Sequence, residues 1–183
     1  YQLNPLAFKL SPVALATVML YSYTKRFTSM SHLWLGLSLS IAPIGAWIAI
    51  KGQFDVLPLL LGLAVMLWTA GFDIIYACQD LDFDRRRGLY SIPAQFGIYA
   101  ALWISMALHV ITVILLVVIW HVSPLGLIYL VGVGLVSAIL IYEHAIVKPH
   151  DLSRVNLAFF TLNGAVSLIL MFLTVADVLM ATW

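Results

Sequence analysis

Charge is scarce in this sequence. Only 9% of its 183 residues are Asp, Glu, Lys or Arg, whereas 63% are hydrophobic and the mean hydropathy is +1.06. Ordinary globular chains carry about 25% charged residues, so the composition excludes a water-soluble domain. The net charge of +1 says little, but no basic tail suggests nucleic acid as a partner. The single cysteine, Cys78, excludes an internal disulfide framework, and we interpret it as a small apolar filler.

Hydrophobic residues occur in six blocks of membrane-spanning length, which is roughly 20 residues. The blocks predict helices over Pro5–Tyr23, Leu33–Ile50, Val56–Gln79, Ile98–Trp120, Leu125–Val147 and Asn156–Ala181. Between the third and fourth helices we expect a loop over Asp80–Phe96. Pro12 and Pro43 predict bends in the first two helices. The predicted fold class is an all-α, polytopic transmembrane helical bundle that forms a single domain over residues 1–183.

Six spans place the connections alternately on two sides of a membrane. One side collects seven of the nine basic residues: Lys25, Arg26, Arg85, Arg86, Arg87, Lys148 and Arg154. The other side has Lys51 and, near the first helix, Lys9. Because cytoplasmic loops are enriched in Lys and Arg, the sequence predicts that the side with seven basic residues faces the cytoplasm.

Four side chains around the end of the third block form the strongest functional signal. Asp73, Tyr76, Asp80 and Asp84 are spaced three, four and four apart, so they share one stripe of a helix. Like charges at i,i+4 repel, and carboxylates at a helix C-terminus oppose the macrodipole. A bound divalent cation would reverse both penalties. Mg²⁺ is typically held by carboxylates together with substrate phosphates, so we predict Mg²⁺ as the cofactor.

The alternative interpretation is that Asp80 and Asp84 are solvated loop acids balanced by Arg85–Arg87. Asp73 favours the functional interpretation, because it lies about two turns inside an apolar helix. An intramembrane carboxylate typically faces a cavity, pairs with a cation or lines an ion pathway.

Basic residues near the acidic stripe allow two interpretations. Lys25 and Arg26 either set the membrane topology or form a phosphate clamp, with Tyr21 one turn earlier on the face of Lys25. Arg86 or Arg87 would similarly neutralise a leaving phosphate or contact lipid head groups.

Polar residues of the last three blocks point to structural roles. We expect His109 to be a packing residue, Glu143 and His144 to be interfacial, and Asp177 to be solvated. The amide of Asn163 lies within the sixth block, where a hydrogen bond between helices would satisfy it.

Several motifs together resemble the UbiA superfamily of intramembrane aromatic prenyltransferases, and its 4-hydroxybenzoate polyprenyltransferase branch in particular. The most specific is D-x-x-Y-A-x-x-D-x-x-x-D over Asp73–Asp84. The others are Tyr21–Thr28 (YSYTKRFT), Ala42–Trp47 (APIGAW), Ser91–Gly97 (SIPAQFG), Asp151–Asn156 (DLSRVN) and Phe159–Gly164 (FFTLNG). The resemblance covers nearly the whole chain, although a Tyr-x-x-x-Lys motif alone would be weak.

The resemblance implies a nine-helix fold around a central cavity, of which these six spans would be the last six. It implies that Asp80 and Asp84 form the second of two aspartate-rich motifs that bind prenyl diphosphate through Mg²⁺. Tyr21 and Lys25 match the family's Tyr/Lys motif, and Arg86 matches a basic position after the second aspartate motif. Deeper on the stripe, we expect Asp73 and Tyr76 to stabilise the allylic cation or to place the acceptor.

The first aspartate motif and three helices of the family are absent from this sequence. We therefore expect a fragment of a longer enzyme, an interpretation that the lack of an initial methionine favours. The function implied is transfer of a polyprenyl group from its diphosphate to an aromatic acceptor for quinone-type biosynthesis, in the bacterial inner membrane with the aspartates at the cytoplasm.

Half of the metal site is missing, so whether this chain is an enzyme by itself stays open. The alternative is a non-catalytic membrane scaffold or accessory subunit of a larger membrane complex. A cation-coupled transporter is a third possibility, but the carboxylates cluster at one mouth and no broken-helix repeat is visible.

Overall fold

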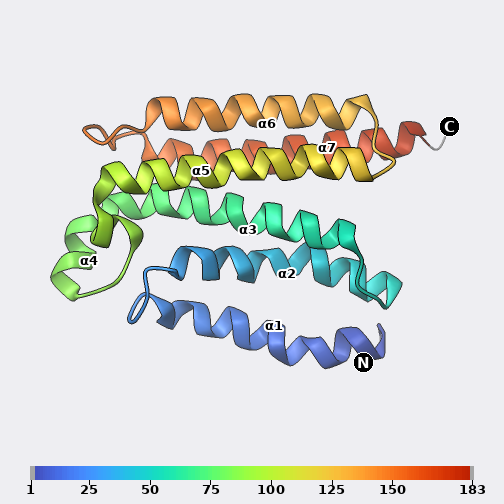
Figure 1. Ribbon diagram of the computed structural model, residues 1–183, viewed down its shortest axis with the longest axis horizontal. Helices are drawn as coiled ribbons and strands as arrows, with labels where there is room; N and C mark the ends of the chain where they lie inside the picture. The colour runs from blue at the N-terminus through green and yellow to red at the C-terminus, as the bar shows by residue number, and fades with distance from the viewer. Residues whose placement is uncertain (1–2, 182–183) are drawn as a thin grey trace.

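The computed structural model describes residues 3–181 and shows a bundle of long helices lying side by side (Figure 1). The helices are α1 (Pro5–Thr24), α2 (Ser31–Lys51), α3 (Val56–Ala77), α4 (Leu81–Arg87), α5 (Ile92–Val122), α6 (Leu127–Ile146) and α7 (Asn163–Ala181). A 3₁₀ turn, η1 (Cys78–Asp80), joins α3 to α4, and a π-helical segment, η2 (Leu157–Leu162), precedes α7. Among the described residues, six helical stretches are long and apolar enough to cross a membrane, which confirms the predicted fold class.

Neighbouring long helices run antiparallel, so the bundle has two distinct ends. At one end lie α4, the α1–α2 connection and the α6–α7 connection (Figure 1). We call this the acidic end, because it carries Asp80, Asp82 and Asp84. Both ends of the described chain, the α2–α3 turn and the α5–α6 turn lie at the other end, which we call the distal end.

Glycines allow α3 to pack closely against both α2 and α5. A Cβ added to Gly36 would come within 2.1 Å of the backbone oxygen of Met66, so α2 and α3 approach each other where only glycine fits. A Cβ on Gly71 would come within 2.3 Å of the His109 ring on α5. Within a bilayer, helices associate without a hydrophobic driving force, and small residues of this kind strengthen the van der Waals contact between them.

The segment after α3 differs from the predicted loop over Asp80–Phe96. Asp80 takes the N-cap position of α4, Asp84 lies in its first turn, and Arg85–Arg87 form its last turn. These charges suit the helix macrodipole. Gly88 then ends the helix with a φ of 64°, which favours glycine. The expectation that Asp80 and Asp84 oppose a helix dipole was therefore wrong, because they begin a new helix, α4, where a loop was predicted.

The start of α5 is also earlier than predicted. Ser91 caps the helix by accepting a hydrogen bond from the Ala94 N–H at 3.3 Å, and a proline occupies the first turn. Gly97 interrupts α5 with a φ of 81°, so the predicted start at Ile98 marks the beginning of its long straight part.

Candidate active site

Asp73, the deepest acid of the predicted stripe, is paired with a histidine from α2. Its Oδ2 lies 2.7 Å from Nδ1 of His32, and the His32 side chain is completely buried. The other ring nitrogen, Nε2, accepts a hydrogen bond from the backbone N–H of Ile92 at 3.3 Å. Three helices therefore meet at one imidazole ring: α2 supplies it, and α3 and α5 bind its two nitrogens.

Asp84 faces the basic segment at the end of α1. Its Oδ2 lies 3.7 Å from Nζ of Lys25, and Asp84 is only 1% exposed, whereas the Lys25 side chain is 30% exposed. The backbone strengthens this junction, because the Tyr90 N–H donates to the carbonyl oxygen of Lys25 at 2.7 Å. Oδ2 of Asp84 is buried without a hydrogen bond, and such a carboxylate is costly unless a cation or a donor meets it.

Asp80 lies between Asp73 and Asp84 in the sequence and is half-buried. In the described part of the chain, it makes no hydrogen bond or ion pair. Tyr76 turns instead toward η2, where its ring lies 4.3 Å from the Phe159 ring. The stripe thus divides: Asp73 binds His32, Asp84 faces Lys25, Tyr76 packs on aromatic rings, and Asp80 is left available.

The remaining basic candidates lie on the surface of the acidic end. The Arg26 guanidinium stacks 5.3 Å from the centre of the Tyr23 ring. Arg86 is exposed and donates from Nε to the backbone oxygen of Asp82 at 3.1 Å. Tyr21 is half-buried and close enough to Asp73 for an electrostatic interaction. Of the predicted substrate residues, Lys25 and Tyr21 are therefore the ones for which the described residues show an interaction with the acidic stripe.

The carboxylates offer a metal ion two ligands rather than a complete site. Within residues 3–181, no three His, Cys, Asp or Glu side chains are grouped as a metal ion requires. Asp84 with its buried, unsatisfied oxygen and the half-buried Asp80 nevertheless fit an ion such as Mg²⁺, which is commonly bound by one or two carboxylates plus substrate phosphates.

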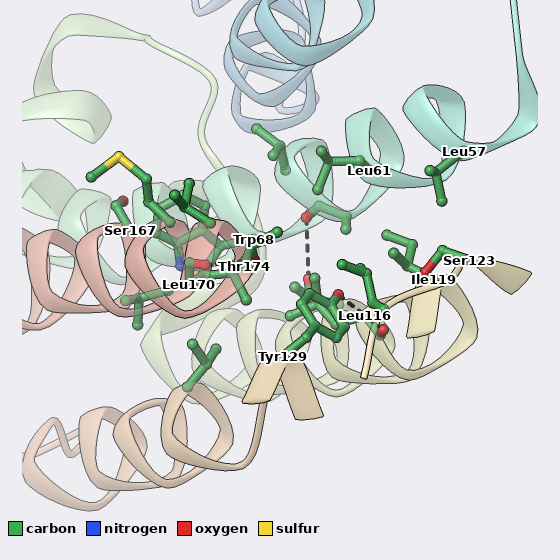
Figure 2. Close-up of a pocket in the computed structure, with 18 of the residues that line it drawn as sticks. Leu57, Leu61, Trp68, Leu116, Ile119, Ser123, Tyr129, Ser167, Leu170 and Thr174 are labelled. Atoms are coloured by element: carbon green, nitrogen blue, oxygen red, sulfur yellow. Dashed lines mark hydrogen bonds between the residues drawn. The ribbon is translucent and has the colours of Figure 1, made fainter. Parts of the chain in front are cut away.

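An apolar cavity of about 610 Å³ opens between α3, α5, α6 and α7 in the distal half of the bundle. Figure 2 shows Leu57 and Leu61 of α3, Leu116 and Ile119 of α5, and Leu170 of α7 around it. Its volume lies within the range of ligand pockets, roughly 300 to 1,000 Å³.

Aromatic rings connect this cavity to the acidic end. Trp68 lines the cavity and packs edge-on against Phe72, with 5.2 Å between ring centres. Phe72 contacts Phe159 at 5.4 Å, and Phe159 contacts Tyr76. The four rings thus form a continuous row of contacts from the cavity wall to Tyr76 on the stripe.

Several polar side chains are placed differently from the sequence expectations. Glu143 is not interfacial but completely buried beside Asn163. Asp177 is not solvated: it is 4% exposed and accepts hydrogen bonds from the backbone N–H groups of Gly126, Ile128 and Tyr129 at the start of α6. Both expectations failed because side chains near the end of a predicted helix were assumed to be exposed.

Two expectations for polar residues hold. The amide oxygen of Asn163 accepts a hydrogen bond from the indole N–H of Trp68 at 2.9 Å, which joins α7 to α3 as predicted. His109 is 2% exposed and packs between helices, with Nδ1 lying 3.0 Å from Nε2 of His144.

His32 is the site residue that sequence reasoning missed. It stands at the second position of α2, near the same end as the aspartates. The predicted second span began at Leu33, so His32 was placed outside it, although an ionisable side chain inside a membrane span is by default a candidate for function.

Comparison with known proteins agrees with this architecture. The model of the UbiA prenyltransferase family matches residues 1–175, and the chain belongs to that family. It is an integral membrane protein with the family's transmembrane fold.

Individual relatives carry the comparison further. The chain is 30% identical over 161 residues to a 4-hydroxybenzoate octaprenyltransferase of Vibrio parahaemolyticus, covering 88% of this chain and 56% of that protein. A protein of the same name from Tolumonas auensis is 31% identical over 163 residues, covering 89% of this chain and 57% of that protein. The chain thus spans little more than half of these relatives.

Two solved structures share the fold. A UbiA homolog from Aeropyrum pernix superimposes with a TM-score of 0.87 at 36% identity, over 97% of this chain and 66% of the other. Digeranylgeranylglyceryl phosphate synthase gives a TM-score of 0.79 at 18% identity, over 96% of this chain and 62% of the other.

Proposed function

We propose that the protein transfers a polyprenyl group from a prenyl diphosphate to an aromatic acceptor for quinone-type biosynthesis, with Mg²⁺ as cofactor. The observation that carries the proposal is Asp84, a nearly inaccessible carboxylate whose Oδ2 lacks a hydrogen bond and faces Lys25 at 3.7 Å. Its half-buried neighbour Asp80 and the 610 Å³ apolar cavity supply the remaining requirements, a second ligand and room for a prenyl tail.

In the proposed reaction, the bond between prenyl C1 and the diphosphate oxygen breaks, and its electron pair leaves with the diphosphate. Prenyl C1 then bonds to a carbon of the acceptor ring, which releases a proton. Mg²⁺ on Asp80 and Asp84 would supply charge stabilisation for the diphosphate. Lys25 and Arg86 add positive charge toward the leaving group, and preorganised charges of this kind are a major source of catalysis.

The apolar part of the molecule has two tasks in this proposal. The cavity excludes water and holds the prenyl tail, and Tyr76, Phe159 and Phe72 present aromatic faces that stabilise an allylic cation. Asp73 faces the acceptor, because it lies deeper than Asp80 and Asp84 and retains partial exposure of 15%. Tyr21 and Arg26 border this region from α1.

The protein is proposed to lie in the bacterial cytoplasmic membrane with the acidic end toward the cytoplasm. Seven of the nine basic residues lie in connections on that side, as the positive-inside rule requires. With only Asp80 and Asp84 as metal ligands, the chain as given is proposed to be inactive alone and to require the family's first aspartate motif.

The test uses the full-length gene product in lipid vesicles supplied with prenyl diphosphate, 4-hydroxybenzoate and Mg²⁺. We expect Asp80→Ala and Asp84→Ala each to lower turnover by about 100-fold or more, as for removal of a group that stabilises developing charge. Asp82→Ala is the matched control, because Asp82 lies on α4 between the two but is exposed and engages Arg86 only through its backbone. Turnover that survives loss of Asp84 would refute the proposal.

A second candidate is a non-catalytic scaffold or accessory subunit of a larger membrane complex. The observation that favours it is the lack of a three-ligand metal group within residues 3–181. Purification from native membranes separates the two candidates. Stoichiometric copurification with other subunits and no Mg²⁺-dependent transfer would support the scaffold, whereas transfer by the isolated protein would exclude it.

A further inference from the structure

We propose that His32 is a positioning residue: it holds one oxygen of the Asp73 carboxylate so that the other oxygen stays directed to the aromatic acceptor. This inference rests on the proposed function, in which Asp73 faces that acceptor. It concerns a residue on α2 that lies outside the aspartate motif and is itself inaccessible to any substrate.

The two contacts of the ring fix its protonation pattern. A backbone N–H can only donate, so Nε2 of His32, which receives the Ile92 N–H, carries no hydrogen. A neutral imidazole then has its hydrogen on Nδ1, and this N–H donates to Oδ2 of Asp73 at 2.7 Å. One oxygen of the carboxylate is thus held in place by a hydrogen bond from a buried ring.

The second oxygen of Asp73 is left for a ligand. Over the part of the chain that the structure describes, no hydrogen bond reaches Oδ1, although the Asp73 side chain is 15% exposed. An oxygen in this state accepts a hydroxyl or amine hydrogen of a bound molecule. The phenol hydroxyl of an aromatic acceptor is such a donor, and its hydrogen bond would orient the ring.

The backbone around Ile92 prevents the His32 ring from turning. Ile92 follows Ser91, which caps α5, and Tyr90, whose N–H is bound by the carbonyl oxygen of Lys25. Rotation of the ring would leave the buried Ile92 N–H without a partner, which is costly. His32 therefore links the orientation of Asp73 to the segment after α4, whose Tyr90 N–H binds the backbone of Lys25, the residue that faces Asp84.

The kinetic test compares variants of the full-length protein in lipid vesicles. His32→Phe keeps the ring volume but removes both nitrogens, whereas His32→Asn keeps an N–H donor near the position of Nδ1. We expect His32→Phe to lower kcat/KM for the aromatic acceptor by roughly 10- to 100-fold, the effect of losing a hydrogen bond to a charged group. His32→Asn should recover most of this loss, and KM for the prenyl diphosphate should stay nearly unchanged.

A double-mutant cycle separates positioning from a general structural role. If His32 acts through Asp73, His32→Phe should have little further effect in an Asp73→Asn background. Losses that add, or a matching rise in KM for the prenyl diphosphate, would overturn the proposal. His121→Asn is the control, because His121 is an exposed histidine at the distal end of α5.

A readout without catalysis keeps the inference separate from the proposed function. In ¹⁵N-histidine-labelled protein, NMR should show His32 as the neutral Nδ1–H form. The His32 signal is identified by its disappearance in His32→Asn, and it should shift in Asp73→Asn. An Nε2–H form, or a signal indifferent to Asp73, would overturn the inference. Lack of prenyl transfer by the unmodified protein would instead defeat the proposed function and leave this result standing.

Discussion

Asp177, near the end of α7, caps the start of α6: its Oδ1 accepts the backbone N–H of Ile128 at 3.0 Å. The same carboxylate binds the N–H groups of Gly126 and Tyr129, so one side chain satisfies three donors at a helix start that has no cap of its own. Donors at a helix N-terminus need such partners, and the macrodipole favours a negative charge there.

Removal of this cap should weaken the contact between α6 and α7. We expect Asp177→Ala to destabilise the protein by about 2 kcal/mol, the upper range for the loss of a helix cap. The effect is measured by thermal unfolding in detergent micelles, with the loss of monodisperse protein as the signal. Asp82→Ala, which removes an exposed carboxylate, should leave the unfolding temperature unchanged within error.

A second prediction concerns the glycine contact between α2 and α3. Gly36→Ala would force a Cβ to within 2.1 Å of the Met66 carbonyl oxygen, so the two helices must separate. We expect a destabilisation of about 1 to 3 kcal/mol, as for overpacking of a well-packed interior. Gly45→Ala on the same helix meets nothing within 4 Å and should be neutral or slightly stabilising. Equal thermal stability of the two variants would contradict the structure.

A third prediction tests the apolar cavity as the space for the prenyl tail. Leu170→Trp adds bulk to its wall. We expect the preference for long over short prenyl diphosphates, expressed as a ratio of kcat/KM values, to fall by about tenfold, because steric exclusion acts on the longer chain. Leu168→Trp is the matched control on α7, since Leu168 is 54% exposed and does not line the cavity. An unchanged ratio would place the tail elsewhere.

A fourth prediction addresses the Asp84–Lys25 pair. Lys25→Met leaves Asp84 buried without its facing cation, and it removes a positive charge from the proposed diphosphate site. We expect kcat/KM for the prenyl diphosphate to fall by about tenfold or more, while Lys25→Arg retains part of the activity through its charge. Lys148→Met, which removes an exposed lysine at the same end of the bundle, should behave as the unmodified protein.

Hydropathy was sufficient to predict the architecture. The first helix, predicted over Pro5–Tyr23, extends over Pro5–Thr24, and the second, predicted over Leu33–Ile50, extends over Ser31–Lys51. Long uninterrupted apolar blocks determine such spans almost alone. Motif resemblance likewise predicted the family, because the aspartate and tyrosine spacing over Asp73–Asp84 is specific.

Pairings between distant helices were beyond the reach of sequence reasoning. His32 and Asp73 are 41 positions apart, and Asp177 lies 49 positions from Ile128. Helical periodicity shows which residues share a face of one helix, but it does not show which faces of two helices meet. The buried state of Glu143 was missed for the same reason, since its neighbour Asn163 belongs to another helix.

The left-handed conformation of Gly97 divides α5 into a short segment at the acidic end and a long rod that reaches the distal end. The short segment carries the Ile92 N–H that binds His32, whereas the rod carries Leu116 and Ile119 of the cavity wall. The acidic end and the apolar cavity are therefore lined by different parts of one helix, joined at a residue whose positive φ favours glycine.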